Sequence, residues 1–302
     1  MSGLLAVDGG QTTLRAGAGD LRAESPGPRR TDDPATLADA VIALWRRLDR
    51  PHVDTIALGL SMLPAAPGDR VEVAEHLQRQ TAAATVIMAD DGITAHLGAL
   101  PDLEGISVTA GTGVACTGFM PGHPVAVVDG AGFLLGDEGG GFWIGREGLR
   151  AAVRAHDGRG PATALTAAAE ARFGSLAGLP DRLHEDARPA ETIAGFAVDV
   201  QQLAADPVAA DIVGRAAAAL RESAEAAARR TQATVVSLGG RALTAGGPLH
   251  AATRAQLAAS GFTTVDAAGT PLDGARRLTA GLPDAFAPHV HTYTRTVVPH
   301  ER

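Results

Sequence analysis

Residues 3–17 read Gly-Leu-Leu-Ala-Val-Asp-Gly-Gly-Gln-Thr-Thr-Leu-Arg-Ala-Gly. The apolar run 3–8 is typical of a buried strand that ends at an acidic residue, Asp8. Glycines follow at once, and the run 12–17 indicates a second strand directly after the turn. The stretch therefore predicts a strand, a tight turn and another strand, with an acid at the turn.

The segments after this pair predict alternating helices and strands. Residues 34–49 place apolar side chains at helical spacing, and Asp33 followed by Pro34 supplies a cap and a first-turn proline. The other expected elements of this half are strands over 20–24, 55–60 and 85–89, and helices over 69–81 and about 92–98.

A second cycle of the same kind begins near residue 105. A strand over 105–110 leads into a glycine turn, and a strand over 114–119 pairs back onto it. The remaining expected elements are a strand over 125–129, an alanine-rich helical stretch from 143 to about 230, a strand over 234–238, a helix over 248–259, and ordered segments at 263–265 and 273–281.

The repetition predicts an internally duplicated α/β protein whose two lobes close a cleft on a ligand. We expect one lobe over residues 1–104 and the other over 105–282. The tail 283–302 has three prolines and three histidines, and we expect it to be loosely packed or ordered only by a partner.

Composition describes a globular protein of a reducing cytoplasm. The chain has 302 residues, of which 45% are hydrophobic and 20% are charged. No apolar run of about 18 residues and no basic segment before an N-terminal apolar run is present, so we expect neither a membrane span nor a signal peptide. The single cysteine, Cys116, excludes an internal disulfide and a cysteine-rich metal site.

The charge pattern excludes two further classes of site. The formal net charge is −8, and the chain has no lysine. Non-specific nucleic-acid binding rests on neutralising phosphates, so we expect no nucleic-acid partner. A P-loop needs its lysine on the β- and γ-phosphates, so that route to nucleotide binding is closed.

Three glycine turns point to a different nucleotide site. They lie at 8–12, 110–113 and 239–240, each directly after an apolar strand. Backbone N–H groups at such turns form anion-binding concavities without lysine, and threonine hydroxyls add donors. One turn alone is weak evidence, but three at the ends of separate strands favour phosphate binding.

Acidic residues stand beside the glycine turns. Asp8 is a candidate Mg²⁺ ligand through water, and the alternative is a plain turn residue. Asp91 is a candidate general base for phosphoryl transfer to an alcohol, and the alternative is a cap of the helix that follows. Asp137 is a candidate ligand of a hydroxyl group or of the metal shell.

Residues 130–149 combine many glycines with the acidic pair Asp137-Glu138 and large apolar side chains. Dense glycine implies backbone that takes unusual dihedrals or approaches a ligand closely. A mobile surface loop is the alternative, but Phe142 and Trp143 are not typical of a loop tip.

In these motifs the chain resembles the BadF/BadG/BcrA/BcrD-type ATPase family, and within it the N-acetylglucosamine kinases, which have the actin-like ATPase fold. The resemblance runs in order over about residues 4–281. The stretches that carry it are Asp8 to Thr12 (Asp-Gly-Gly-Gly-Thr in the family), Asp90-Asp91 (Asn-Asp), Ala110 to Gly113 (Ser-Gly-Thr-Gly), residues 130–149, and Val235 to Gly240. The segment 136–145 is the most specific part.

The resemblance implies an ATP-dependent kinase that uses Mg²⁺ to phosphorylate an amino sugar at its 6-hydroxyl, in a protein that is commonly a homodimer. Asp91 would be the general base, and Asp8 would serve the metal. ATP would be bound by Gly9, Gly10, Gln11, Thr12, Thr112, Gly113, Gly239 and Gly240. The sugar would be contacted by Asp137, Gly132, Ala131, Gly111, Thr112 and Arg30.

The sequence departs from the family pattern at several of these positions. Gln11 and Thr13 replace a glycine and a lysine of the first turn, and Ala110 replaces a serine of the second. Ala131 stands where sugar kinases often carry a tryptophan, and the segment around Arg30 stands where many members carry an asparagine. The motifs leave the identity of the sugar open, and the candidates are N-acetylglucosamine, glucosamine and an N-acetylmuramate.

Two other functions are compatible with the same fold. One is an ATPase that activates a partner enzyme, but relatives of that kind hold an iron–sulfur cluster between subunits, and Cys116 supplies only one thiolate per chain. The other is a sugar sensor without turnover, which the retained Asp91 and Asp137 disfavour. His96, in the helix after Asp91, is expected at the surface or at the edge of the cleft.

Overall fold

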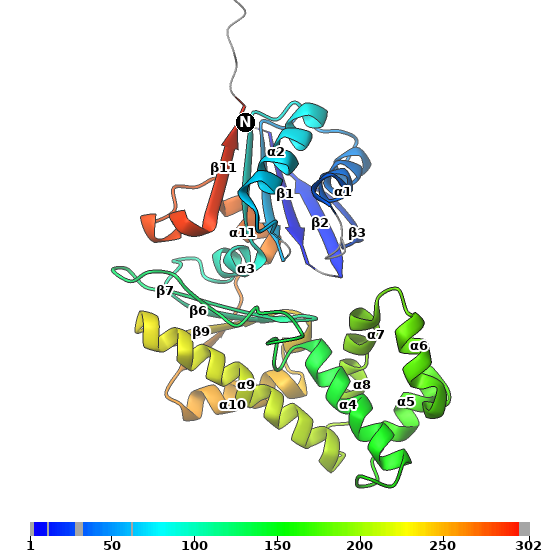
Figure 1. Ribbon diagram of the computed structural model, residues 1–302. Coiled ribbons are helices and arrows are strands. Elements are labelled where there is room, and N and C mark those ends of the chain that lie inside the picture. Colours follow the sequence, from blue (N-terminus) through cyan, green and yellow to red (C-terminus); the bar gives the residue numbers. More distant parts are fainter. Residues whose placement is uncertain (1–2, 11, 28–32, 62, 296–302) are drawn as a thin grey trace, which may run out of the picture. The chain divides into compact units, whose positions relative to one another are not determined.

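The computed structural model describes residues 3–10, 12–27, 33–61 and 63–295. The chain divides into two compact units (Figure 1). The first contains the residues up to Leu103 together with those from Ala268 onwards, and the second runs from Glu104 to Ala267. The segment 268–282, expected in the second lobe, therefore belongs to the first unit.

The first unit contains, within the described residues, a sheet with strand order β11-β5-β4-β1-β2-β3. Its strands are β1 (Leu4–Gly9), β2 (Thr13–Ala18), β3 (Leu21–Pro26), β4 (Thr55–Leu60), β5 (Thr85–Asp90) and β11 (Val290–Thr294). Its helices are α1 (Pro34–Arg47), α2 (Pro67–Thr81), α3 (Asp91–Ala99), α11 (Pro271–Arg277) and the 3₁₀ helix η3 (Asp284–His289).

The parallel strands β1, β4 and β5 end together at one edge of this sheet. Gly9 of β1 pairs with Leu60 of β4, and Leu60 pairs in turn with Asp90 of β5. Since parallel strands point the same way, the turn after β1 and the first residue of α3 lie at the same edge.

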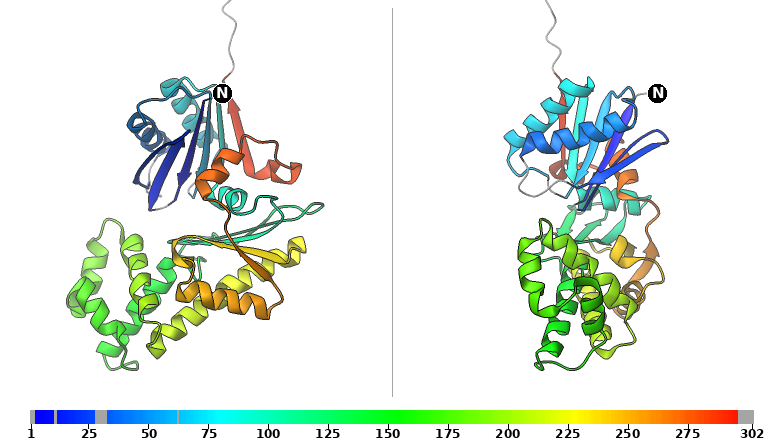
Figure 2. Two further views of the ribbon diagram at one scale, coloured as in Figure 1. Left: turned by 180° about the vertical axis from the view of Figure 1, so that it is seen from behind. Right: turned by 90° about the vertical axis from the view of Figure 1, so that its right-hand side faces the viewer.

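Alternate side chains of β1 face two different layers. Leu5 and Val7 belong to the apolar core that the sheet shares with α1 and α2. Ala6 packs instead on Leu272 and Ala275 of α11. Figure 2 shows the two layers, with α1 and α2 over one face and α3 and α11 over the other. The period of two along a strand separates these faces.

Helices α3 and α11 cross in close contact. A Cβ on Gly274 would lie 1.7 Å from the carbonyl oxygen of Thr94, a separation that no side chain tolerates. Arg277 donates hydrogen bonds to the carbonyls of Leu100 at 2.9 Å and Pro101 at 2.7 Å, at the end of α3. The chain that returns from the second unit is therefore fastened to the first.

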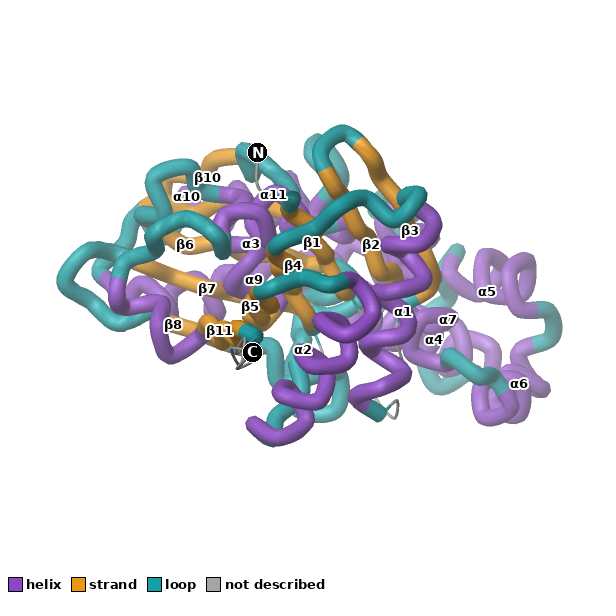
Figure 3. Tube along the Cα trace, turned by 90° about the horizontal axis from the view of Figure 1, so that it is seen from above, coloured by secondary structure: helices purple, strands orange, loops and turns teal. Residues whose placement is uncertain are grey.

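The second unit contains β6 to β10 and most of the helices. Its strands are β6 (Gly105–Ala110), β7 (Val114–Phe119), β8 (Ala126–Val128), β9 (Val235–Gly239) and β10 (Thr263–Asp266). Its helices are α4 (Gly141–His156), α5 (Leu165–Phe173), η1 (Leu176–Gly178), α6 (Leu179–Glu185), α7 (Pro189–Gly195), α8 (Ala197–Gln202), α9 (Pro207–Thr231), η2 (Arg241–Leu243) and α10 (Pro248–Ala259). Helices α4 to α7 form a group beside the sheet (Figure 3).

The two sheets share one topology. The order in the second unit is β10-β9-β6-β7-β8, which repeats the order β5-β4-β1-β2-β3 of the first unit. In each unit the first strand pairs antiparallel with the second and parallel with the fourth. The predicted duplication is therefore present as two equivalent five-strand arrangements within the described residues, to which β11 adds an edge strand in the first unit.

The expectation of a loosely packed tail was wrong for residues 283–295. Strand β11 pairs antiparallel with β5 along its whole length, and Phe286 is completely buried beside the ring of His96, with ring centroids 6.1 Å apart. His96 is itself buried and lies within hydrogen-bonding distance of the Leu103 carbonyl at 2.8 Å, so its expected surface position was also wrong. Among the described residues no helix is long and apolar enough to cross a membrane.

Candidate functional site

Asp8 lies near the end of β1 and is 6% exposed. Its side chain is on the sheet face that also packs against α11, because Ala6, two residues earlier, faces that layer. The Arg15 guanidinium donates a hydrogen bond to Asp8 Oδ2 over 3.3 Å. Burial raises the pKa of the Asp8 carboxyl, and the charge of Arg15 acts in the opposite direction.

The turn after Asp8 is held by backbone hydrogen bonds. The carbonyl of Gly9 accepts from the backbone N–H of Ser61 at 2.8 Å and from its hydroxyl at 3.0 Å. The Gly10 N–H donates to the Thr13 carbonyl at 3.1 Å, and the Thr12 carbonyl accepts from Gly27 at 3.0 Å. The turn is thereby fixed between β1 and β2. Gln11, which was expected to bind ATP, lies outside the described residues.

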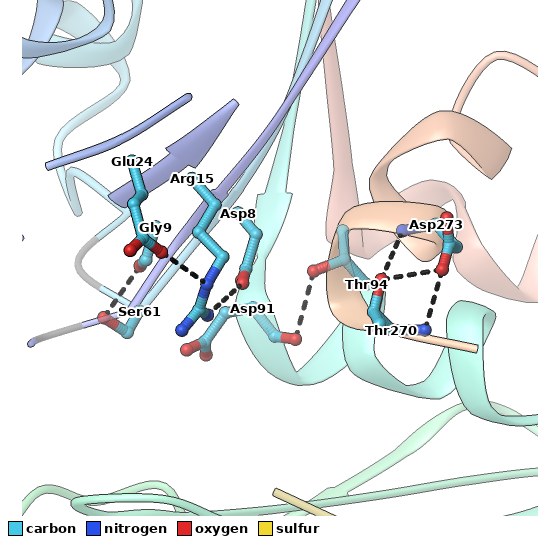
Figure 4. A network of polar contacts seen from close by, with 9 residues as sticks. All are labelled: Asp8, Gly9, Arg15, Glu24, Ser61, Asp91, Thr94, Thr270 and Asp273. Carbon is cyan, nitrogen blue, oxygen red and sulfur yellow. Dashed lines mark hydrogen bonds and ion pairs between the residues drawn. The ribbon is translucent and has the colours of Figure 1, made fainter. Parts of the chain in front are cut away.

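Asp91 is the first residue of α3 and is half-buried. Its neighbour Asp90 is the residue that caps this helix, since the Asp90 carboxylate accepts from the Gly92 N–H at 2.9 Å. The Asp91 carbonyl accepts from the Thr94 hydroxyl at 3.1 Å. Figure 4 shows the Asp91 carboxylate directed to the side on which the Asp8 and Arg15 side chains lie. The alternative of a helix cap therefore applies to Asp90.

The glycine turn of the second unit, residues 110–113, connects β6 to β7. The Gly111 N–H donates to the Gly113 carbonyl at 2.9 Å, which closes the turn. The first turn of α4 holds this glycine turn through two more hydrogen bonds. The Gly141 N–H donates to the Gly111 carbonyl at 2.8 Å, and the Phe142 N–H donates to the Thr112 carbonyl at 2.9 Å. The backbone of this turn is therefore held by the segment that follows residues 130–140.

Asp137 connects the two segments through its side chain. It is 3% exposed and has a left-handed backbone conformation with φ of 60°. Its Oδ1 accepts from the Val114 N–H at 3.2 Å, and its own N–H donates to Asp129 Oδ1 at 2.9 Å. A Cβ on Gly113 would lie 2.4 Å from Asp137 Oδ2, so only glycine leaves room for this carboxylate.

The last glycine pair, Gly239-Gly240, lies against the same turn. The position of a Cβ on Gly240 is 2.3 Å from the Ala110 carbonyl oxygen, and its φ is 93°. Gly132, in the loop before Asp137, accepts hydrogen bonds from Leu135 at 3.1 Å and Gly136 at 2.8 Å, and Ala131 is exposed.

The expected site residues therefore fall into two groups, one in each unit. The first unit brings together Asp8, Gly9, Gly10, Thr12 and Asp91 at one sheet edge. The second unit brings together Gly111, Thr112, Gly113, Asp137, Gly239 and Gly240 around the end of β6. Arg30, expected at the sugar, lies outside the described residues.

Sequence reasoning missed Arg15 and Asp129. Both act on a residue that was predicted, Arg15 on Asp8 and Asp129 on Asp137. Arg15 was detectable in principle, because a short turn between two strands places residues of the second strand opposite those of the first. No comparable signal identified Asp129, whose partner lies eight residues away in an irregular loop.

A Mg²⁺ ion would find a suitable ligand in this arrangement. Among the described residues no cluster of three or more acidic, histidine or cysteine side chains is present. Mg²⁺ does not require one, because it keeps several waters and binds through one or two carboxylates and substrate phosphates. Asp8 offers one buried carboxylate beside a glycine turn, which fits that mode of binding.

Comparison with known proteins gives the same family as the motifs. A model of the BadF/BadG/BcrA/BcrD ATPase family matches residues 7–272. An N-acetylmuramic acid/N-acetylglucosamine kinase of Clostridium acetobutylicum is 38% identical over 80 residues. That match covers 26% of this chain and 26% of the kinase, so it spans about a quarter of the curated relative.

Solved structures share the fold over nearly the whole chain. A protein of Chromobacterium violaceum assigned as an N-acetylglucosamine kinase is 24% identical, with a TM-score of 0.68 over 91% of this chain and 98% of its own. A Porphyromonas gingivalis protein with the same assignment is 18% identical, with a TM-score of 0.73 over 91% and 96%. These likenesses confirm the expected duplicated α/β fold of the actin-like ATPases.

Proposed function

The chain belongs to the BadF/BadG/BcrA/BcrD ATPase family, and on this premise we propose that it is an ATP-dependent kinase that phosphorylates an amino sugar at its 6-hydroxyl. N-acetylglucosamine and glucosamine are the leading acceptors. The observation that carries the proposal is the edge of the first sheet, where a fixed glycine turn and the half-buried Asp91 occur together. Phosphoryl transfer needs both a phosphate-binding backbone and a base for the acceptor alcohol.

Asp91 is the proposed general base. It takes the proton of the sugar hydroxyl while that oxygen forms a bond to the γ-phosphorus, and the bond from the γ-phosphorus to the bridging oxygen breaks to release ADP. The cap of α3 is already supplied by Asp90, so the Asp91 carboxylate is not needed to complete the helix. When bound at Asp8, Mg²⁺ would neutralise charge on the phosphates.

The glycine turns are the proposed phosphate sites. Gly9, Gly10 and Thr12 would bind phosphate in the first turn, and Gly111 to Gly113 in the second. In both turns backbone N–H groups would donate hydrogen bonds to phosphate oxygens. Gly239 and Gly240 would contact the nucleotide on its adenosine side. Gln11 is proposed beside them on the family resemblance alone.

The sugar is proposed to contact the loop around Asp137. Asp137, Gly132 and Ala131 come from that loop, Gly111 and Thr112 from the second turn, and Arg30 from the first lobe. The carboxylate of Asp137 is nearly fully buried and accepts a backbone hydrogen bond, so any contact with a hydroxyl is additional to its support of the turn. We further propose that the protein is cytoplasmic and forms a homodimer. Light scattering in solution tests the dimer.

One assay tests the proposed function. ADP release is measured against hexoses, hexosamines and N-acetylated sugars, with a control that lacks sugar. We expect turnover that depends on an amino sugar, and a drop of roughly 10²- to 10⁴-fold in Asp91→Asn with sugar binding retained. Asp69→Asn, which removes an exposed carboxylate of α2, is the matched control and keeps full turnover.

The other outcomes select the rival functions. Strong ADP release without any sugar would indicate an ATPase that acts on a partner enzyme. Sugar binding without any ADP release would indicate a sensor. Unchanged turnover in Asp91→Asn would remove Asp91 from the chemistry.

A further inference from the structure

Three charged side chains form a row across the first three strands. Asp8 of β1 pairs directly with Arg15 of β2, and Arg15 pairs directly with Glu24 of β3. Residues opposite each other in a sheet point to the same face, so the three side chains meet. Figure 4 shows the Arg15 guanidinium between the two carboxylates.

This row lies on the face of the sheet that carries α3 and α11. The neighbours of Arg15 along β2, Leu14 and Ala16, are buried in the opposite layer with α1 and α2. The period of two therefore directs Arg15 to the other face, where α3 begins with Asp91. The cation consequently stands on the side of the sheet at which the proposed base lies, next to the turn after β1.

Neither carboxylate uses the full donor set of Arg15. One Nη1 hydrogen bond reaches Asp8 Oδ2 at 3.3 Å, and the Nε atom lies 3.7 Å from Glu24 Oε2. A guanidinium offers five N–H donors and binds most strongly through two parallel hydrogen bonds. Among the described residues the Nη2 atom contacts neither carboxylate through a hydrogen bond, and the Arg15 side chain is 42% exposed.

The geometry points to Arg15 as a phosphate ligand: we propose that it binds the β- and γ-phosphates of ATP, with Glu24 keeping the guanidinium in place. The inference rests on the proposed function. The chain has no lysine, so a permanently cationic side chain at the phosphates must be an arginine. A triphosphate brings several negative charges to a turn that already carries the carboxylate of Asp8. An adjacent guanidinium offsets these charges.

The test is calorimetric titration of ATP, ADP and AMP, each with EDTA present so that metal binding does not contribute. We expect Arg15→Met to weaken ATP binding roughly 10- to 100-fold, ADP binding less, and AMP binding not at all. Arg15→Lys keeps the charge without the fork and is expected to fall between the two. Arg22→Met, which removes an exposed arginine of β3, is the matched control and binds all three nucleotides normally.

The results separate the failure of this inference from the failure of the proposed function. A wild-type protein that binds no ATP, either with EDTA or with Mg²⁺ in its place, would refute the kinase itself. If Arg15→Met binds ATP as tightly as the wild type does, the proposed role of Arg15 is refuted and the proposed kinase function is not. An Arg15→Met protein that melts earlier and loses affinity for ATP, ADP and AMP equally would show that Arg15 only joins the strands, and would also overturn the inference.

Discussion

At the scale of single residues, Asp8 combines a functional position with a cost in stability. Burial raises the pKa of its carboxyl above the ordinary value of 3.8, and Arg15 offsets this only in part. The folded protein therefore binds the Asp8 proton more tightly than the unfolded chain does. The resulting stabilisation is fully present below the unfolded pKa and is lost as pH rises through the folded pKa.

Asp8→Asn is accordingly expected to stabilise the ligand-free protein at about pH 8, where the wild type carries a buried charge, and to have a smaller effect at about pH 4. Urea unfolding of both proteins at the two pH values measures the difference. Asp69→Asn, which removes an exposed carboxylate, serves as the control. A gain that does not depend on pH, or a loss at pH 8, would contradict the prediction.

Two of the acidic residues that sequence reasoning identified share one property. Asp8 and Asp91 stand at the ends of apolar strands, and a strand end can be recognised from composition alone. Arg15 was missed because its role depends on the register between β1 and β2, which places it opposite Asp8. That register follows from the length of the turn between the strands, and not from the composition of either strand alone.

At the scale of elements, the strands and helices follow their sequence patterns closely. The expected strands 55–60, 105–110 and 114–119 are observed with the same bounds. The purely local signals of apolar runs, turns and caps suffice for these. They do not suffice for α11, because the sequence predicted only an ordered segment over 273–281. The packing of this helix onto α3 depends on Gly274 meeting a helix far away in the chain.

The loop that contains Asp137 offers a prediction at the same scale. Asp137→Ala removes the acceptor of the buried Val114 N–H, and we expect it to lower the free energy of unfolding by about 1–3 kcal/mol. Asp137→Asn keeps an oxygen at that place and is expected to retain most of the stability. Urea denaturation of the two variants measures the difference, and equal stability of both would contradict it.

Asp137→Asn also separates support of the turn from contact with the sugar. If Asp137 also binds a sugar hydroxyl, Asp137→Asn raises the sugar KM while the ATP KM stays near that of the wild type. An equal rise in both KM values would assign Asp137 only to the support of the turn 110–113, because its carboxylate lies beside Gly113 of that turn.

At the scale of the whole molecule, the duplicated topology was predictable because the strand–turn–strand pattern recurs in the sequence. The return of the chain was not. Residues 268–295 belong to the first unit, although they follow the last strand of the second. Their sequence alone carries no signal of which sheet they join, since that is decided by an unpaired edge of β5 and by the space beside His96.

Removal of residues 284–302 is therefore expected to destabilise the first unit. It exposes the edge of β5, removes the hydrogen bond from Gln78 to the Tyr293 carbonyl at 3.1 Å, and takes the buried ring of Phe286 away from His96. Phe286→Ala alone is expected to cost about 3–5 kcal/mol, as for other buried aromatic side chains.

Urea unfolding of the truncated protein and of Phe286→Ala measures the effect. Deletion of residues 296–302 alone keeps each of these contacts and is the matched control, for which we expect unchanged stability. Two variants that unfold at the wild-type urea concentration would show that the edge strand contributes nothing to the fold. Loss of stability in the longer deletion and in Phe286→Ala, but not in the control, would establish the C-terminal segment as a structural part of the first unit.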